Sequence, residues 1–235
     1  MPVTPIIALD VSTAEDALRI VDELGDRCAF YKVGNELFTA AGPSVVREIR
    51  ARGSDVFLDL KFHDIPNTVA GGVRNAARLG TRLVTVHALG GLAMLRAAVD
   101  AGGDSCGVLA VTVLTSLEAN DVATTWGRDS SLSLSAEVIR LAAIGADAAV
   151  HGVVCSGREA AAVHDRFGDD LAILVPGVRQ PGAASHDQAR VVSPREAANA
   201  GARYIVVGRM VTAATDRRTA MDGVLRDLAQ SLSPL

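Results

Sequence analysis

The chain has 235 residues, of which 49% are hydrophobic and 21% charged, and this length suffices for a large buried core. Its 27 acidic residues outnumber its 23 basic residues, which gives a formal net charge of −4, and only 3% of its residues are aromatic. Proteins that grip nucleic acids usually carry a basic excess and aromatic stacking surfaces, so we expect no nucleic-acid partner.

The N-terminal segment and the cysteines indicate a cytoplasmic protein. The first ten residues hold no basic cluster and reach Asp10 after a short apolar run, unlike a signal peptide. No stretch of about eighteen apolar residues follows, so we expect no membrane partner. The three cysteines, Cys28, Cys106 and Cys155, are odd in number and widely spaced, which predicts reduced thiols rather than disulfides or a zinc site.

Eight short β-rich runs follow one another, with helical patterns between them. Most are almost continuously apolar, which is typical of strands that are buried on both faces. They span residues 5–11, 28–34, 55–62, 82–89, 107–115, 148–156, 171–179 and 203–211. This alternation predicts an α/β fold of the (β/α)₈ TIM-barrel class, with residues 1–235 as a single barrel catalytic domain. A doubly wound open sheet is the alternative, but no GxGxxG motif follows the first strand.

Capping residues and loop lengths add to this prediction. Ser12 with Glu15 predicts a capping box for the first helix, and Pro43 predicts the start of another. Ser193 with Glu196 predicts a further capping box. The intervals after the fifth and seventh strands are longer than the others. Extra residues there would lie on the C-terminal face of the barrel, where long loops often act as lids.

The third predicted strand carries charges where a barrel needs a core. Asp59 and Lys61 share one face because strand side chains alternate, whereas Leu58, Leu60 and Phe62 take the other face. The apolar face should pack on the helices. We therefore expect Asp59 and Lys61 inside the barrel, near the C-terminal end of the strand.

Two neighbouring strands add to these charges. Asp10 ends the first strand and Lys32 lies late in the second, so two carboxylates and two ammonium groups can meet. A structural cluster of ion pairs is the alternative, but charges at adjacent barrel strand ends favour a functional site. Asp64 follows Lys61 by three residues, before a helix, and either caps that helix or joins the site.

The ends of the seventh and eighth strands indicate a phosphate site. The segment from Pro176 to Arg179 ends one strand, and Gly208 with Arg209 ends the next. Phosphate sites of such barrels are commonly built after these two strands, where glycine allows a close backbone approach and arginine supplies a fork of donors. Gln188 lies in the long loop between them. The alternative is that both arginines are surface residues.

The histidines and the absent catalytic motifs are less informative. No HxH, HExxH or GxSxG motif occurs, so the sequence demands neither a metal nor a serine nucleophile. His151 is expected to be a core histidine of the sixth strand. The roles of His63 and His87 stay open.

Residues 59–69 carry a family resemblance. The sequence Asp59-Leu-Lys61-Phe-His-Asp64-Ile-Pro-Asn-Thr68 resembles the Asp-x-Lys-x-x-Asp signature of orotidine 5′-phosphate decarboxylases in its usual context. Asp10, Lys32, the turn Leu114-Thr115-Ser116, the segment Pro176–Arg179, Gln188, Gly208 and Arg209 also fall where that family has them. The resemblance covers essentially the whole chain.

The resemblance implies a cofactor-free decarboxylation of orotidine 5′-monophosphate to uridine 5′-monophosphate, the last step of de novo pyrimidine biosynthesis. It implies that Lys61 stabilises a carbanion and donates a proton, that Asp59 faces the substrate carboxylate, and that Lys32 and Asp64 complete a catalytic charge array. It also implies a homodimer with shared active sites, in which Asp64 and Thr68 reach into the partner subunit's site. The resemblance implies no metal at the site. The substrate-binding residues that it implies are Asp10, Lys32, Asp59, Thr68, Thr115, Ser116, Pro176, Arg179, Gln188, Gly208 and Arg209.

Two other functions remain as alternatives. Magnesium-dependent sugar-phosphate decarboxylases and hexulose-phosphate synthases of the same barrel superfamily share the Asp-x-Lys-x-x-Asp core. They have an acidic residue where this chain has Lys32 and lack the motif context that follows Lys61. The second alternative is a non-catalytic module that binds nucleotide phosphates.

Overall fold

The computed structural model describes residues 2–129, 131–179 and 192–232. Parallel strands form a closed barrel in sequence order, and the last strand pairs with the first. The predicted (β/α)₈ barrel is therefore confirmed, and the open sheet is excluded. The strands are β1 (Thr4–Ala8), β2 (Phe30–Gly34), β3 (Asp55–Phe62), β4 (Leu83–His87), β5 (Gly107–Val111), β6 (Gly152–Val154), β7 (Ala172–Val178) and β8 (Tyr204–Val207).

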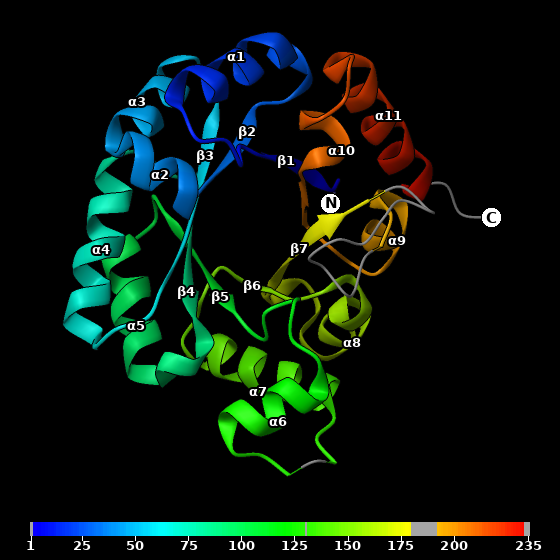
Figure 1. Ribbon diagram of the computed structural model, residues 1–235. Coiled ribbons are helices and arrows are strands. Elements are labelled where there is room, and N and C mark those ends of the chain that lie inside the picture. The colour runs from blue at the N-terminus through cyan, green and yellow to red at the C-terminus, as the bar shows by residue number, and fades with distance from the viewer. Residues whose placement is uncertain (1, 130, 180–191, 233–235) are drawn as a thin grey trace.

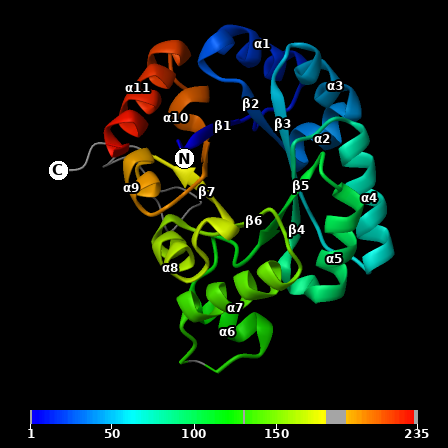
Figure 2. The same cartoon turned by 180° about the vertical axis from the view of Figure 1, so that it is seen from behind.

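Helices surround the barrel as a ring, which is visible from both sides (Figures 1 and 2). They are α1 (Ala14–Leu24), α2 (Asn35–Ala41), α3 (Pro43–Ala51), α4 (Pro66–Arg78), α5 (Gly91–Gly102), α6 (Ala119–Trp126), α7 (Leu134–Asp147), α8 (Gly157–Phe167), α9 (Pro194–Asn199), α10 (Arg209–Thr212) and α11 (Arg217–Ala229). Short 3₁₀ turns cover Gly25–Arg27, Ala88–Gly90, Gly168–Asp170 and Gln230–Leu232. No helix in the described part of the chain is both long and apolar enough to span a membrane.

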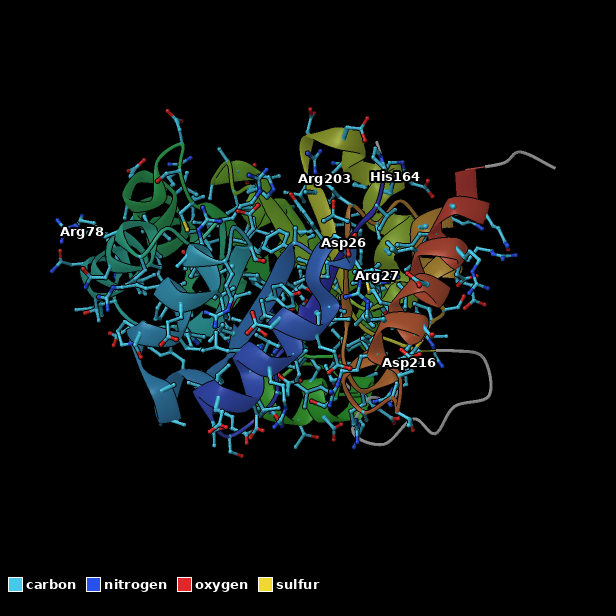
Figure 3. The ribbon with its side chains drawn as sticks, turned by 90° about the horizontal axis from the view of Figure 1, so that it is seen from above. Asp26, Arg27, Arg78, His164, Arg203 and Asp216 are labelled. Atoms are coloured by element: carbon cyan, nitrogen blue, oxygen red, sulfur yellow. The ribbon has the colours of Figure 1, made fainter. Side chains whose placement is uncertain are left out.

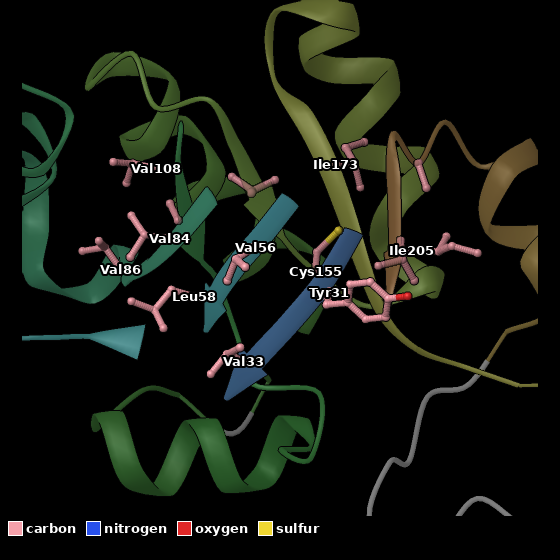
Figure 4. Close-up of a cluster of buried hydrophobic side chains, with 14 of the residues drawn as sticks. Tyr31, Val33, Val56, Leu58, Val84, Val86, Val108, Cys155, Ile173 and Ile205 are labelled. Carbon is pink, nitrogen blue, oxygen red and sulfur yellow. The ribbon is translucent and has the colours of Figure 1, made fainter. Parts of the chain in front are cut away.

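The apolar core has two layers because both faces of the strands are covered. In β3, Phe57 belongs to an inner cluster made of strand residues, whereas its neighbours Val56 and Leu58 pack outward against the helices. Figure 4 shows part of this outer layer, including Val56, Leu58 and Tyr31. The alternation explains why the strands read as continuous apolar runs. The three cysteines are free and buried, as predicted.

Some element boundaries differ from the prediction. The sixth strand is only Gly152–Val154, and His151 precedes it as an exposed residue whose Nε2 lies 3.1 Å from the Tyr204 hydroxyl. The eighth strand ends at Val207, because Arg209–Thr212 forms the short helix α10 instead of continuing the strand. The expectation of a core histidine within a long sixth strand was therefore wrong.

The N-cap of the first helix lies one residue later than predicted. Thr13 is the N-cap and accepts a hydrogen bond from the N–H of Asp16 at 3.1 Å. The Ser12 hydroxyl instead donates to Glu36 at 2.7 Å. The helix that begins at Pro43 and the capping box of Ser193 with Glu196 are confirmed.

Charged side chains lie mainly on the outside of the helical ring, as Figure 3 shows for Arg78 and Asp216. Some of them join the first and last β/α units. Arg27 donates to Asp222 of α11 at 2.8 Å, and Arg217 of α11 pairs with Glu23 of α1. Both pairs are only partly buried at the surface, where ion pairs stabilise a fold little, so the closure of the ring rests chiefly on packing.

Candidate active site

A cavity of about 470 Å³ opens where the strands reach their C-terminal ends. This is the face on which barrels of this class place their functional loops. Its apolar part comes from strand residues such as Val111, Val154, Leu174 and Val206. The predicted site residues that line it are Asp10, Lys32, Asp59, Lys61, Thr115, Pro176, Arg179, Gly208 and Arg209.

Four of these residues form a row of charges that alternate in sign. Lys32 Nζ lies 2.8 Å from Asp10 Oδ1 and 3.8 Å from Asp59 Oδ2. Lys61 Nζ lies 2.9 Å and 3.0 Å from the two carboxylate oxygens of Asp59. The prediction that three neighbouring strands bring these charges together is confirmed.

The exposed fraction of the side chains differs between the middle and the two ends of this row of charges. The Lys32 and Asp59 side chains are only 12% and 14% exposed, and such charges are tolerated because each lies between opposite charges. Lys61 is 33% exposed and Asp10 is 63% exposed. Lys61 therefore presents an ammonium group that is held by a buried carboxylate and is still accessible from the cavity.

The backbone around Lys61 departs from a regular strand. The ladder between β3 and β4 pairs Leu58 with Val84 and next pairs Phe62 with Val86, so a bulge lies between these pairs. Lys61 has a φ of 50°, a left-handed conformation that is uncommon for a residue with a side chain. Asp59 and Lys61 both lie in this irregular stretch, and both line the cavity.

Two residues at this site were missed by the sequence reasoning. The Thr85 hydroxyl of β4 accepts a hydrogen bond from the Lys61 N–H and donates one to Asp59 Oδ1, each at 2.9 Å. In the sequence, Thr85 could have been recognised as a polar residue at an inward-facing position of a largely apolar strand. Gly34 ends β2, and a Cβ there would lie 3.0 Å from Lys32 Nζ. Glycine at this position therefore leaves room for the pair between Lys32 and Asp10.

The part of the cavity formed by the ends of β7 and β8 carries the predicted anion-binding groups. Gly177 and Arg179 come from the end of β7, and Gly208 and Arg209 follow β8. Arg179 Nε is buried and has no hydrogen-bond partner among the described residues. Because a buried guanidinium N–H needs an acceptor, this side of the cavity suits a phosphate group.

Several predicted site residues do not line this cavity. Asp64 and Thr68 are exposed at the start of α4, and Asp64 Oδ1 accepts a hydrogen bond from the N–H of Ile65 at 2.6 Å. Ser116 is exposed next to Thr115 and is also absent from the lining. Gln188 lies outside the described residues.

The two histidines whose roles were open lie next to each other and near Lys61. The rings of His63 and His87 are 5.4 Å apart, and His87 Nδ1 is buried without a hydrogen-bond partner in the described part of the chain. Burial lowers the pKa of His87, and the neighbouring His63 and Lys61 lower it further. A neutral His87 ring therefore adds no positive charge beside Lys61 at neutral pH. Within the described ranges, no group of three His, Cys, Asp or Glu side chains is arranged to hold a metal ion.

Comparisons with known proteins agree on one family. Residues 4–224 match the model of the family described as "Orotidine 5′-phosphate decarboxylase / HUMPS family". The chain is 45% identical over 224 residues to an orotidine 5′-phosphate decarboxylase of Halorhodospira halophila, and this match covers 95% of each chain. It is 48% identical over 225 residues to one of Alkalilimnicola ehrlichii, again covering 95% of each chain. The crystal structure of orotidine 5′-phosphate decarboxylase from Lactobacillus acidophilus superposes with a TM-score of 0.84 at 36% identity, covering 97% of this chain and 99% of that one.

Proposed function

Because the chain belongs to the orotidine 5′-phosphate decarboxylase / HUMPS family, we infer that it decarboxylates orotidine 5′-monophosphate to uridine 5′-monophosphate in pyrimidine biosynthesis. The observation that carries this inference is a row of charges in a cavity that Arg179 and Arg209 also line. The row consists of Asp10, Lys32, Asp59 and Lys61. A reaction that creates negative charge at a carbon atom needs such a fixed cation, and a nucleotide needs an anion-binding end.

The chemistry assigned to Lys61 follows from its charge and its protons. The bond from C6 of the pyrimidine to the carboxylate breaks, carbon dioxide leaves, and the electron pair stays on C6. The Lys61 ammonium stabilises this developing charge and then transfers a proton to C6, after which water restores the lysine proton. No electron acceptor is required for these steps.

Asp59 and Lys32 prepare the ammonium group for this role. Asp59 fixes Lys61 Nζ through both carboxylate oxygens, so the cation needs no reorientation as charge develops. Asp59 would also repel the substrate carboxylate and so raise the energy of the bound ground state. Lys32 lies between Asp10 and Asp59, and its positive charge offsets the repulsion between these two carboxylates.

The remaining proposed substrate contacts form two groups, one at the pyrimidine and ribose and one at the phosphate. Thr115 would orient the pyrimidine together with Ser116, and Asp10 with Lys32 would reach the ribose hydroxyls. Arg179, Gly208 and Arg209 would hold the phosphate, with Pro176 in the wall and Gln188 from the following loop. Binding energy from this distant phosphate is available to favour the reaction at C6.

A cytoplasmic homodimer with shared sites is the assembly that we propose, with residues 1–235 acting as one catalytic domain. Asp64 and Thr68 are exposed at the start of α4, outside the cavity of their own chain. Ile65 between them is 68% exposed, whereas the other exposed large apolar side chains of the described residues, Leu89, Leu114 and Leu225, are 36–39% exposed. A second copy that covers Ile65 would bring Asp64 and Thr68 toward the partner's site.

The magnesium-dependent alternative is disfavoured by the charge row. Lys32 Nζ lies between Asp10 and Asp59, so an ammonium group stands where the magnesium-dependent enzymes have an acidic residue that could bind the ion. A non-catalytic module is disfavoured as well, because it would gain nothing from a lysine held next to a buried carboxylate in the cavity.

An absorbance assay tests this function. Purified protein is mixed with orotidine 5′-monophosphate, with and without a strong chelator, and loss of the substrate absorbance is followed. We expect rapid conversion to uridine 5′-monophosphate at the same rate in both samples. Activity that disappears with the chelator would support the magnesium-dependent alternative, and no conversion in either sample would refute the proposed reaction.

A further inference from the structure

The bulge between β3 and β4 leaves an unequal number of residues on the two strands. Leu58 pairs with Val84 and Phe62 with Val86, so three residues of β3 stand opposite Thr85 alone. A bulge of this kind interrupts the backbone ladder, and its N–H groups need other acceptors. Thr85 fills this role at Lys61, whose N–H donates to the Thr85 hydroxyl at 2.9 Å.

The same hydroxyl also contacts the charge row. Its proton is donated to Asp59 Oδ1 at 2.9 Å, and that oxygen also accepts from Lys61 Nζ at 2.9 Å. A single buried oxygen atom therefore joins the backbone of Lys61 to the carboxylate that holds its ammonium group. Thr85 itself is fully buried, so water does not compete for these hydrogen bonds.

We propose that Thr85 is a positioning residue for the decarboxylation, because its hydroxyl fixes both ends of Lys61. This inference rests on the proposed function. Lys61 adopts a φ of 50°, which costs energy for a non-glycine residue and persists only when its surroundings enforce it. The hydroxyl enforces it at the backbone, and through Asp59 it also sets where the ammonium group points.

The role needs a group that accepts and donates at once. A hydroxyl can donate its one proton to the carboxylate and still accept from a backbone N–H. Valine has almost the same shape but offers neither bond, whereas serine keeps both. These two replacements therefore separate the hydrogen bonds of Thr85 from its packing.

Thr81, which lies just before β4, provides a matched control. Thr81 is also buried, and its hydroxyl donates to the carbonyl of Ala76 at 2.9 Å, away from the charge row. Thr81→Val removes a buried hydroxyl of the same type. It therefore reports what a general loss of stability does to the enzyme.

The test compares Thr85→Val, Thr85→Ser and Thr81→Val with the wild type by kcat, KM, product affinity and thermal unfolding. Loss of a hydrogen bond that involves a charged group predicts a kcat for Thr85→Val about 10- to 100-fold below wild type. KM and the Kd for uridine 5′-monophosphate should change by less than about threefold, because positioning of Lys61 matters chiefly in the transition state. Thr85→Ser should restore kcat to within about threefold of wild type, and Thr81→Val should keep wild-type kcat despite a lower Tm.

Three results would overturn the proposal. They are a Thr85→Val enzyme with more than half of the wild-type kcat, a Thr85→Ser enzyme as impaired as Thr85→Val, and an equal loss of kcat in Thr81→Val. If Thr85→Val does not fold, Thr85→Cys takes its place, because a thiol is a much weaker donor of similar size. Its kcat should then fall between those of Thr85→Ser and Lys61→Ala, and wild-type kcat would overturn the proposal.

Failure of the proposed function gives a different result. In that case the wild type itself would not decarboxylate orotidine 5′-monophosphate. Crystal structures of the wild type and Thr85→Val would then decide the inference about Thr85. If Lys61 leaves the left-handed conformation in the variant, the inference is supported. If the conformation of Lys61 is unchanged, the inference is overturned.

Discussion

Lys61 Nζ lies within hydrogen-bond distance of both carboxylate oxygens of Asp59, at 2.9 Å and 3.0 Å, although a single residue separates them in β3. The pair lies on one face of one strand, at the edge of the cavity. A substrate carboxylate that enters there meets the negative charge of Asp59 as well as the positive charge of Lys61. In the proposed reaction, this arrangement would oppose the carboxylated substrate and favour the carbanion that remains after carbon dioxide leaves.

Replacing Lys61 by alanine should nearly abolish turnover and leave nucleotide binding measurable. The ammonium group acts mainly on charge that develops in the transition state, so kcat should fall to well below about a tenth of the wild-type value. Stopped assays with orotidine 5′-monophosphate measure turnover, and titration with uridine 5′-monophosphate measures binding. Circular dichroism serves as the control for folding. A Lys61→Ala enzyme that keeps a tenth of wild-type turnover would show that another group donates the proton.

Replacing Arg209 by alanine should weaken the grip on the phosphate. Loss of a charged hydrogen bond should reduce kcat/KM by the equivalent of about 1.5–3 kcal/mol. The nucleoside orotidine, which lacks the phosphate, is the matched control substrate and should respond little to the substitution. If both substrates lose kcat/KM equally, Arg209 supports the local structure at the start of α10 instead of binding phosphate.

The sequence predicted the barrel and much of the charge row because both depend on simple periodicity. Alternation along β3 was enough to separate Asp59 and Lys61 from Leu58, and barrel order brought Lys32 next to them. The outer packing of Leu58 agrees with that reasoning. Regular geometry of this kind is encoded in spacing along the chain.

Features that depend on irregular geometry were not predictable in this way. Thr85 meets Lys61 because of the bulge, and Gly34 matters only because Lys32 Nζ lies against it. The end of β8 was also misplaced, since Gly208 and Arg209 are as compatible with an apolar strand pattern as with a turn. Asp64 lies outside the cavity of its own chain, and spacing within one chain carries no signal for a role in a partner's site.

The stability of the protein should decrease on mild acidification partly through His87. Burial lowers the pKa of His87, His63 and Lys61 lower it further, and Asp59 opposes this only in part. The folded state therefore binds fewer protons there than the unfolded state. An unfolded histidine titrates near pH 6.5, so this contribution to stability is fully present above about that pH and is lost as the pH falls toward the folded-state pKa. For one proton the free energy of unfolding changes by at most about 1.4 kcal/mol per pH unit.

Urea unfolding at pH values on both sides of that range measures this effect. We expect His87→Asn to lose less stability than the wild type between about pH 7 and about pH 5.5. Thr81→Val is the control, because it lowers stability without removing an ionisable group and should keep the wild-type pH dependence. Identical pH dependence in His87→Asn and the wild type would exclude His87 as a source of acid sensitivity.

Mixing two inactive variants tests whether the active sites are shared between subunits. Lys61→Ala and Asp64→Asn should each be nearly inactive as homodimers. When equal amounts are dissociated together and reassembled, about half of the dimers should be mixed if association is random. In a mixed dimer with shared sites, one site combines an intact Lys61 with an intact Asp64, and the other site carries both substitutions.

Activity in the mixture should therefore recover to about a quarter of the wild-type value per chain, since half of the dimers hold one competent site of two. Asp64 Oδ1 accepts from the N–H of Ile65 in its own chain, so a purely local role is the specific alternative. In that case each site of a mixed dimer would keep one of the two lesions, and mixing would restore nothing. Differently tagged subunits allow mixed dimers to be purified and assayed, and mixed dimers without activity would rule out the shared site.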